Sequence, residues 1–259
     1  MTRTLLIITG AALVLCLACM AGAAALGGRD LARNGWAWTI QEGDGDHIRF
    51  QRVNGAAQPG PQATRNLAWT GQDALTIDNA LKVAFIQGDQ AGVVISGPQD
   101  IIDRVGVEGG RIFLKDGADR VTFGLRRDGF EAWADTEMIR ITVTAPAVRR
   151  FAVNGSGELD IRNYDQDTME IDISGSAEVT GAGKARRLDL SISGSGTADL
   201  SNLALVDAEI DIAGSGGAKV GPTGRADISI SGSGDVDLTR RPASVTRSIS
   251  GSGAINESF

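Results

Sequence analysis

The chain has 259 residues, a formal net charge of −7 and a sequence pI near 4.8, and its 42% hydrophobic content suits a globular core. Nucleic-acid binding needs a concentrated basic face, whereas the arginine pairs of this acidic sequence are scattered, so we expect no nucleic-acid partner. Glycine is unusually frequent, with 35 residues, and aromatic residues make up only 5% of the chain. A backbone with many small residues is therefore expected.

Residues 4–28 form an uncharged, apolar stretch, which predicts an N-terminal signal or membrane-anchor helix over residues 1–28. The small residues of "AGAAA" favour cleavage by a signal peptidase, while the length of the stretch also fits a retained anchor. A third interpretation is lipidation at Cys19 in "CLAC". All three export the remainder to the periplasm or cell surface, with membrane contact only through residues 4–28 if they stay uncleaved.

Few residues with catalytic or metal-binding chemistry remain in the exported part. Cys16 and Cys19 are the only cysteines and lie in the leader, so an internal disulfide or a thiolate metal site is excluded. The single histidine, His47, has no second imidazole nearby and is interpreted as incidental. We therefore expect no catalytic residues and no cofactor.

Residues 29–75 are interpreted as a lead-in or linker, because they contain "QEGDGD" and two separated prolines. Three tryptophans, Trp36, Trp38 and Trp69, indicate that parts of this segment fold back onto the protein. Residues 76–259 form the predicted main domain. It opens with short strands such as "LTIDNALKVAFIQG", and "GPQDIIDRV" predicts a single helical turn.

A repeat occupies residues 151–256. The residue that precedes each Gly-Ser pair recurs at intervals of 20, 19, 20, 18 and 19, at Asn154, Ser174, Ser193, Ala213, Ser231 and Ser250. A fixed period of about 19 residues predicts a repeat architecture of six units.

The columns of the aligned repeats predict strands on both sides of the Gly-Ser-Gly corner. Three residues before each anchor stand Phe151, Ile171, Leu190, Ile210, Ile228 and Arg247, and one residue before it stand Val153, Ile173, Ile192, Ile212, Ile230 and Ile249. Apolar columns alternate with polar ones, which is the period of a strand with one buried face. Arg247, and Glu257 in a later column, replace apolar residues in the last unit and predict a polar C-terminal cap.

One unit alone buries too little apolar surface to offset the entropy of ordering its backbone, so neighbouring units must share hydrogen bonds and a core. The sequence therefore predicts an all-β fold, a single-stranded parallel β-helix, or solenoid, with coils of about 19 residues. Glycine permits positive φ at each corner, and the middle serines are predicted to form a hydroxyl ladder. Gly175-Ser176-Ala177 is expected to have slightly different backbone angles.

The repeated "ISGSGD" units resemble the auto-transporter adhesin head domain family, also called the head GIN domain. "ITVTAPAVRRFAVNGSGELDI" and "LKVAFIQGDQAGVVISGPQDIIDRVGVEGGRIFLK" precede them and share the resemblance, which extends from Asp78 to Asn256. The resemblance implies an exported, repeat-built β-helix. It also implies adhesion, and it supplies no catalytic residues.

One acidic column raises the question of a metal site. Four residues before each anchor stand Arg150, Glu170, Asp189, Glu209, Asp227 and Thr246, so like charges stack about one coil apart. Either basic neighbours and water screen this repulsion, or calcium bridges the candidate ligands Glu170, Asp189, Glu209 and Asp227. The calcium-binding nonapeptide is missing, which favours the screened interpretation.

Three functional hypotheses follow. We favour an exported, non-enzymatic solenoid that binds an unknown protein or glycan partner in the cell envelope or outside the cell. The alternatives are a structural spacer with no ligand of its own and a polysaccharide-active β-helix enzyme. The compact coils leave no long loops with which to build an enzyme cleft, and no acid pair stands out for glycoside hydrolysis.

Overall fold

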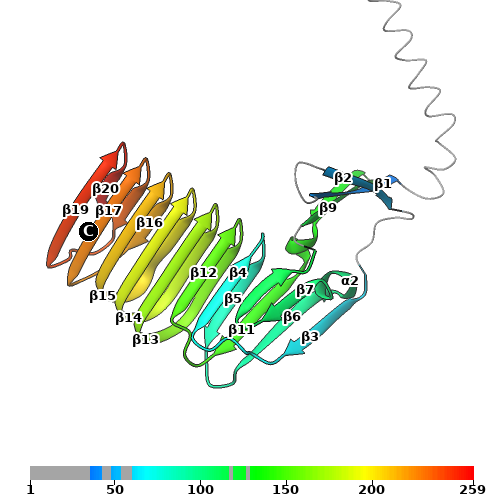
Figure 1. Ribbon diagram of the computed structural model, residues 1–259, viewed down its shortest axis with the longest axis horizontal. Coiled ribbons are helices and arrows are strands. Elements are labelled where there is room, and N and C mark those ends of the chain that lie inside the picture. Colours follow the sequence, from blue (N-terminus) through cyan, green and yellow to red (C-terminus); the bar gives the residue numbers. More distant parts are fainter. Residues whose placement is uncertain (1–35, 43–47, 54–59, 117–118, 127–128) are drawn as a thin grey trace, which may run out of the picture. The chain divides into compact units, whose positions relative to one another are not determined.

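The computed structural model describes residues 36–42, 48–53, 60–116, 119–126 and 129–259 (Figure 1). These residues belong to two compact units, one drawn from Met1–Gln58 with Arg120–Trp133 and the other from Pro59–Asp119 with Ala134–Phe259. The predicted leader, with its cleavage and lipidation sites, lies outside the described residues, as does His47. Neither helical turn in the described part of the chain has the length and apolar content needed to span a membrane.

The smaller unit is a four-stranded antiparallel sheet in the order β10-β9-β1-β2. Its strands are β1 (Trp36–Glu42), β2 (Ile48–Val53), β9 (Arg120–Arg126) and β10 (Gly129–Ala134). In β1, Ile40 stands opposite Phe50 of β2 on one side and Val121 of β9 on the other. The segment interpreted as a lead-in thus supplies strands that pair with residues some eighty positions further along the chain.

The larger unit is a solenoid whose coils each contribute to three faces. The first face contains β4 (Ala74–Asp78), β12 (Arg150–Gly155), the ends of β13 (Glu158–Gly175), β14 (Glu178–Gly194) and β15 (Thr197–Gly214), then β17 (Arg225–Gly232) and β19 (Ser244–Gly251). The second face contains β5 (Lys82–Gln87), the starts of β13, β14 and β15, then β16 (Gly217–Val220), β18 (Asp235–Leu238) and β20 (Ala254–Glu257). The third face contains the middle parts of β13, β14 and β15. The parallel pairing confirms the predicted β-solenoid.

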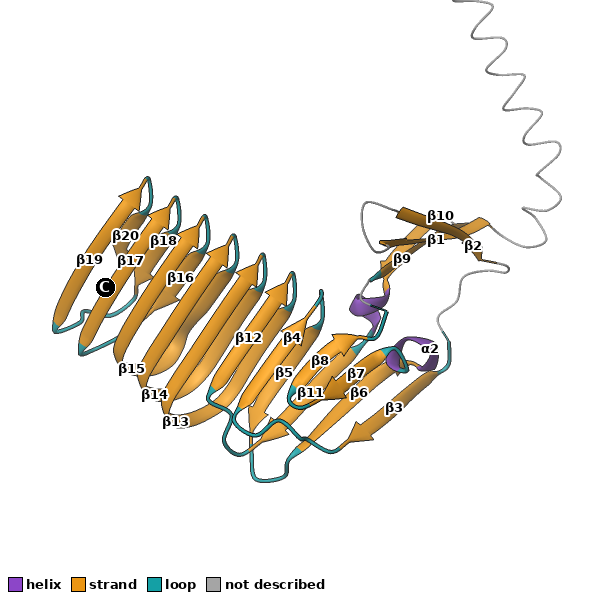
Figure 2. Cartoon of the chain, viewed as in Figure 1, coloured by secondary structure: helices purple, strands orange, loops and turns teal. Residues whose placement is uncertain are grey.

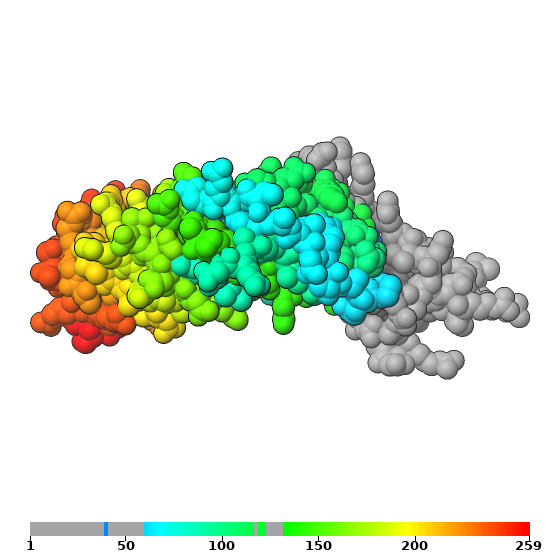
Figure 3. All heavy atoms as spheres, turned by 90° about the horizontal axis from the view of Figure 1, so that it is seen from below, coloured from blue at the N-terminus to red at the C-terminus, as the bar shows by residue number. Residues whose placement is uncertain are grey.

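The register between coils is the one that the repeat predicts. Ile173 lies opposite Ile192, which lies opposite Ile212, and Ile212 lies opposite Ile230. All four side chains are buried, with at most 2% of their surface exposed. Side chains one coil apart therefore stack on each other in a shared apolar interior. In Figure 3 the coils from β12 to the C-terminus follow chain order along this unit, from green to red.

The Gly-Ser-Gly corners align along one edge of the solenoid (Figure 2). The first glycine of each corner has a positive φ, between 100° and 129°, at Gly155, Gly175, Gly194, Gly214, Gly232 and Gly251. The ladder between corners runs through backbone amides: Ser195 N donates to Gly175 O, and Ser215 N donates to Gly194 O, both at 2.8 Å. It replaces the predicted hydroxyl ladder, because an amide already points at the carbonyl of the preceding coil. At Gly175 φ is 113°, inside the range of the other corners, so alanine at the third corner position leaves the φ of the first glycine in that range.

The N-terminal end of the solenoid both adds a coil and closes the core. On the second face, β11 (Arg140–Ala145) pairs with β5 and with β6 (Gly92–Pro98), and β6 pairs with β3 (Gln62–Leu67). On the first face, β8 (Arg111–Leu114) pairs with β4 and with β7 (Val105–Glu108). The predicted helical turn is confirmed as α2 (Gln99–Ile102), and a 3-10 turn, η1, covers Asp135–Met138. The buried side chains of Ile101 and Ile102 help to cover the core.

Charged side chains cap the C-terminal coil. Arg247 of β19 forms an ion pair with Glu257 of β20, and both side chains are about half exposed. Arg241 lies over the ring of Phe259, 5.1 Å from its centroid. The two charged residues that interrupt the apolar columns therefore neutralise each other at the end of the solenoid, as the sequence predicts.

Candidate binding groove on the third face

The third face is hollowed because its strands stop before the last coils do. In the middle coils, Asp165 of β13 stands opposite Lys184 of β14, and Lys184 stands opposite Ala204 of β15. In the next coil, β16 ends at Val220 and "GPTG" follows, because Pro222 lacks the N–H that a central strand needs. A tight turn therefore replaces the strand at this point.

Hydrogen bonds hold that turn against the last strand of the third face. Thr223 N donates to Leu205 O and Val206 O, both at 3.2 Å, and Gly224 N donates to Val206 O at 2.7 Å. The Thr223 hydroxyl also donates to Leu205 O at 3.1 Å. The turn is thus fixed at the edge of β15 and leaves an open hollow beside it.

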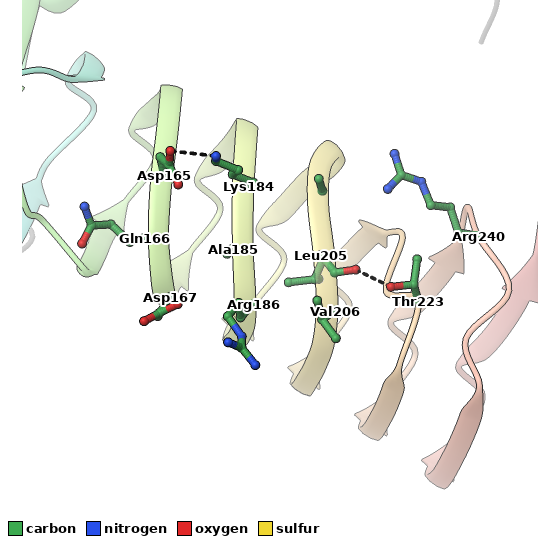
Figure 4. Close-up of a pocket in the computed structure, with 11 residues that line it drawn as sticks. Asp165, Gln166, Asp167, Lys184, Ala185, Arg186, Leu205, Val206, Thr223 and Arg240 are labelled. Atoms are coloured by element: carbon green, nitrogen blue, oxygen red, sulfur yellow. Dashed lines mark hydrogen bonds and ion pairs between the residues drawn. The ribbon is translucent and has the colours of Figure 1, made fainter.

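This hollow is a groove of about 640 Å³ that crosses successive coils (Figure 4). We call it the third-face groove. Its lining comprises Asp165, Gln166, Asp167, Lys184, Ala185, Arg186, Ala204, Leu205, Val206, Thr223 and Arg240. Charged side chains therefore surround a floor of small and branched apolar ones.

The charges of the third-face groove are only partly neutralised. Lys184 Nζ lies 2.9 Å from Asp165 Oδ2. Within the described residues, by contrast, Arg186, Arg240 and Asp167 have no ion-pair partner, and all three are exposed. The groove therefore offers two guanidinium groups and one carboxylate to a ligand.

A second hollow, of about 620 Å³, lies over β5, β11 and the start of β13. Lys82 Nζ lies 3.3 Å from Glu158 Oε2, and Arg162 forms an ion pair with Asp160. Most of its charges thus neutralise each other within the protein. This hollow therefore has less to offer a charged ligand than the third-face groove.

The predicted acidic column is present on the first face, where Glu170, Asp189, Glu209 and Asp227 stand opposite one another in adjacent coils. Arginines approach two of them: Arg187 lies 2.8 Å from Glu209 and Arg225 lies 3.0 Å from Asp227. Among the described residues, no group of three or more His, Cys, Asp or Glu side chains is arranged to hold a metal ion. Calcium binding by the column stays the alternative to the screened interpretation, and a measurement has to decide between them.

Among the described residues, three carboxyl groups have shifted pKa values. Burial raises the pKa of Asp189, and the neighbouring charge of Glu209 raises it further. The hydrogen bond from Arg150 lowers the pKa of Asp73, and the hydrogen bond from the Ser201 hydroxyl, at 2.6 Å, lowers that of Asp199. Of these three, Asp189 is therefore the one whose ionised form the folded protein disfavours.

The interior contributes no chemistry to a surface site. The Tyr164 hydroxyl donates to Thr168 O at 2.6 Å, and burial raises the pKa of Tyr164. Its ring packs edge-on against Phe151, with 6.0 Å between the ring centroids, and Phe151 packs similarly against Phe85. These aromatic residues join coils at the N-terminal end and have a structural role.

The third-face groove was not predicted from the repeats. The alignment covers the residues around each corner, whereas the groove is lined by the irregular segments between repeats. Two signals in the sequence point to it: the charge-rich "DQD" and "KARR" segments, and the Gly221-Pro222 pair that ends a strand. Gly221 also leaves room for the stem of Arg240, since a Cβ there would lie 3.1 Å from Arg240 Cγ.

The stacked coils and the surface groove place the protein in the class of β-solenoids. In such proteins stacked repeats form an extended outer surface. The chain belongs to the family described as "Putative auto-transporter adhesin, head GIN domain", whose profile matches residues 72–242. The match covers well over half of the chain and confirms the resemblance drawn from the repeats. Among curated proteins, none matches the sequence.

Several solved structures share the fold. A putative adhesin from Bacteroides fragilis superposes with a TM-score of 0.54 at 17% sequence identity, and the match covers 76% of this chain and 97% of that one. A putative adhesin from Parabacteroides distasonis gives a TM-score of 0.52 at 14% identity, with the same coverage. At these identities the likeness shows the fold alone.

Proposed function

We propose that this chain is a non-enzymatic binding module of the cell envelope or cell surface and that it holds its ligand in the third-face groove. The observation that carries the proposal is the groove itself, in which exposed Arg186, Arg240 and Asp167 have no ion-pair partner among the described residues. Unpaired charges around an apolar floor give a ligand both contact area and orientation. A spacer would need neither feature.

Two further findings support this proposal. The family description names an adhesin, and two of the solved structures that share the fold are described as putative adhesins. The apolar leader over residues 4–28 supports export. Backbone hydrogen bonds join neighbouring coils at each corner. The groove is therefore pre-formed, and ligand binding would not have to order it.

The enzymatic alternative finds little support in the groove. A carboxyl pair for glycoside hydrolysis needs one free acid and one free base. Of the two acids in the groove, Asp165 is held by Lys184, which leaves Asp167 without a second free carboxyl group. We therefore infer binding without turnover.

A glycan array and an envelope pull-down with the purified full chain test the proposal. Ala204→Trp fills the groove with an indole, so we expect it to abolish binding. Ala152→Trp makes the same change on the outer side of the first face and should leave binding intact. Equal binding by both variants would contradict the groove as the site, and release of reducing ends from a polysaccharide would contradict the non-enzymatic assignment.

A further inference from the structure

We propose that the ligand of the third-face groove is an anionic polysaccharide, whose acidic groups contact Arg186 and Arg240 while its sugar rings lie on the apolar floor. This inference rests on the proposed function and names its ligand class. Guanidinium groups bind carboxylate, sulfate and phosphate oxygens in pairs of hydrogen bonds, so they fit an acidic sugar chain of any of these chemistries.

Arg186 and Arg240 differ in their ion pairing from three arginines on the other faces of the solenoid. Arg162 is paired with Asp160, Arg187 with Glu209, and Arg225 with Asp227. Arg186 and Arg240 are exposed and have no such partner in the described part of the chain. These three arginines are neutralised within the protein, whereas Arg186 and Arg240 stay available in the groove.

The distance between Arg186 and Arg240 also favours an extended ligand. Arg186 and Arg240 belong to coils three steps apart, which places their backbones about 14 Å apart at a spacing of about 4.8 Å per coil. Figure 4 shows Val206 and Thr223 on the ribbons between them. An extended chain with repeated charges can bridge this distance and contact both residues at once.

The floor of the groove between the two arginines exposes apolar side chains to a ligand. Ala204 is exposed, and Val206 keeps 44% of its surface exposed although it is apolar. Methyl groups of this kind pack against the C–H faces of sugar rings. The floor therefore adds apolar contact to the two charge-assisted hydrogen bonds.

The remaining faces direct an anionic chain to this groove. The outer side of the first face carries acids in adjacent coils, at Glu170, Asp172, Asp189, Glu209, Asp211 and Asp227. The second face adds acids at Glu158, Asp160, Glu178, Asp199, Asp235 and Asp237. These faces repel a polyanion, so the third-face groove is the favourable contact on an acidic protein.

An acidic protein segment fits the groove less well than a polysaccharide does. Extended peptides usually bind by adding a strand to a free sheet edge. On the third face, β14 is paired on both sides, and the Leu205 and Val206 carbonyls accept hydrogen bonds from Thr223 and Gly224. The Leu205 and Val206 carbonyls are therefore not free to accept hydrogen bonds from an added strand.

Calorimetric titration of the full chain with polygalacturonate, dextran sulfate and phosphomannan tests the inference, with neutral dextran and poly-glutamate as comparisons. The three anionic polysaccharides separate carboxylate, sulfate and phosphate as the acidic group. We expect at least one of them to bind, with an affinity that falls as sodium chloride is added, and neutral dextran to show no binding.

The variants distinguish the groove from overall charge. Arg186→Gln and Arg240→Gln should each weaken binding about threefold to fivefold, and Asp167→Asn should strengthen it by removing a repulsive carboxylate. Arg225→Gln changes the net charge equally on the first face and should have no effect. An equal loss in Arg225→Gln, or poly-glutamate binding as tight as that of the polysaccharides, would overturn the inference. If a different ligand binds in an Ala204-dependent way, the proposed function stands and this inference fails.

Discussion

Gly194 illustrates how single residues fix the corners of the solenoid. Its φ is +118°, and a Cβ built at this position would lie 2.5 Å from the Gly175 carbonyl oxygen of the preceding coil. Both the backbone conformation and the close approach of the next coil therefore require glycine. The shape that recurs at every corner needs a small residue, whereas the hydrogen bonds between corners are made by backbone groups.

Gly194→Ala is expected to destabilise the solenoid by about 3 kcal/mol, because it adds backbone strain and a clash with the carbonyl. Thermal or urea unfolding monitored by circular dichroism measures this loss. Gly217→Ala is the control: its Cβ would meet no atom closer than 3.8 Å, and we expect a change of about 0.5 kcal/mol or less. Equal stability of the two variants would contradict the role given to the corner.

At the same scale, the sequence predicts buried side chains better than polar contacts. Ile173, Ile192 and Ile230 are recognisable as core residues because they alternate with polar neighbours in every repeat. The hydroxyl ladder was inferred from the chemistry of serine alone. Whether a hydroxyl or an amide reaches the next coil depends on backbone geometry, which a residue type does not specify.

At the scale of elements, the first face combines parallel register with like charges. Each carboxylate of the acidic column lies beside another in the adjacent coil, since the register places identical repeat positions together. Arg187 and Arg225 relieve part of the repulsion. Asp189 lies between Glu170 and Glu209 and has a raised pKa.

Asp189→Asn should therefore stabilise the protein by about 0.5 kcal/mol near neutral pH. A raised folded-state pKa means that ionisation of Asp189 costs stability, which is lost as pH rises from the ordinary value of 3.8 through the folded-state pKa. Below 3.8 both states are protonated and the gain should vanish. Melting temperatures of both proteins across this pH range measure the effect.

Glu209→Gln serves as the comparison, because it removes the repulsion but also the ion pair with Arg187, and its gain should be smaller. Calcium is expected to leave the melting temperature unchanged. A calcium-dependent rise in the parent protein that Asp189→Asn abolishes would contradict the screened interpretation of the column.

The strand pairings that sequence reasoning missed are those without a local signal. β9 pairs with β1 across more than eighty residues, and neither segment carries a pattern that names its partner. The third face is similar, because its strands include register shifts between Ile161 and Tyr164 and between Thr180 and Ala182. Such irregularities disrupt the alignment of repeats in the segments that line the groove.

At the scale of the whole molecule, the solenoid behaves as a sum of coils and their interfaces. The fold can be predicted from the sequence because each repeat has the same alternation of apolar and polar residues and the same Gly-Ser corner. The groove does not follow in this way, since it exists where the repeats stop being alike, at the turn around Pro222. Shape is therefore encoded in the regularity of the chain, and the candidate site in its departures from regularity.

Amide hydrogen exchange at the corner serines tests the stacking of coils most directly. The side chains of Ser176, Ser195, Ser215 and Ser233 are exposed, yet their amides each donate to a glycine carbonyl of the preceding coil at 2.8 Å. We expect these amides to exchange orders of magnitude more slowly than in an unstructured peptide, as slowly as those of the flanking strands. Exchange at all four serines at the rate of an unstructured peptide would contradict it.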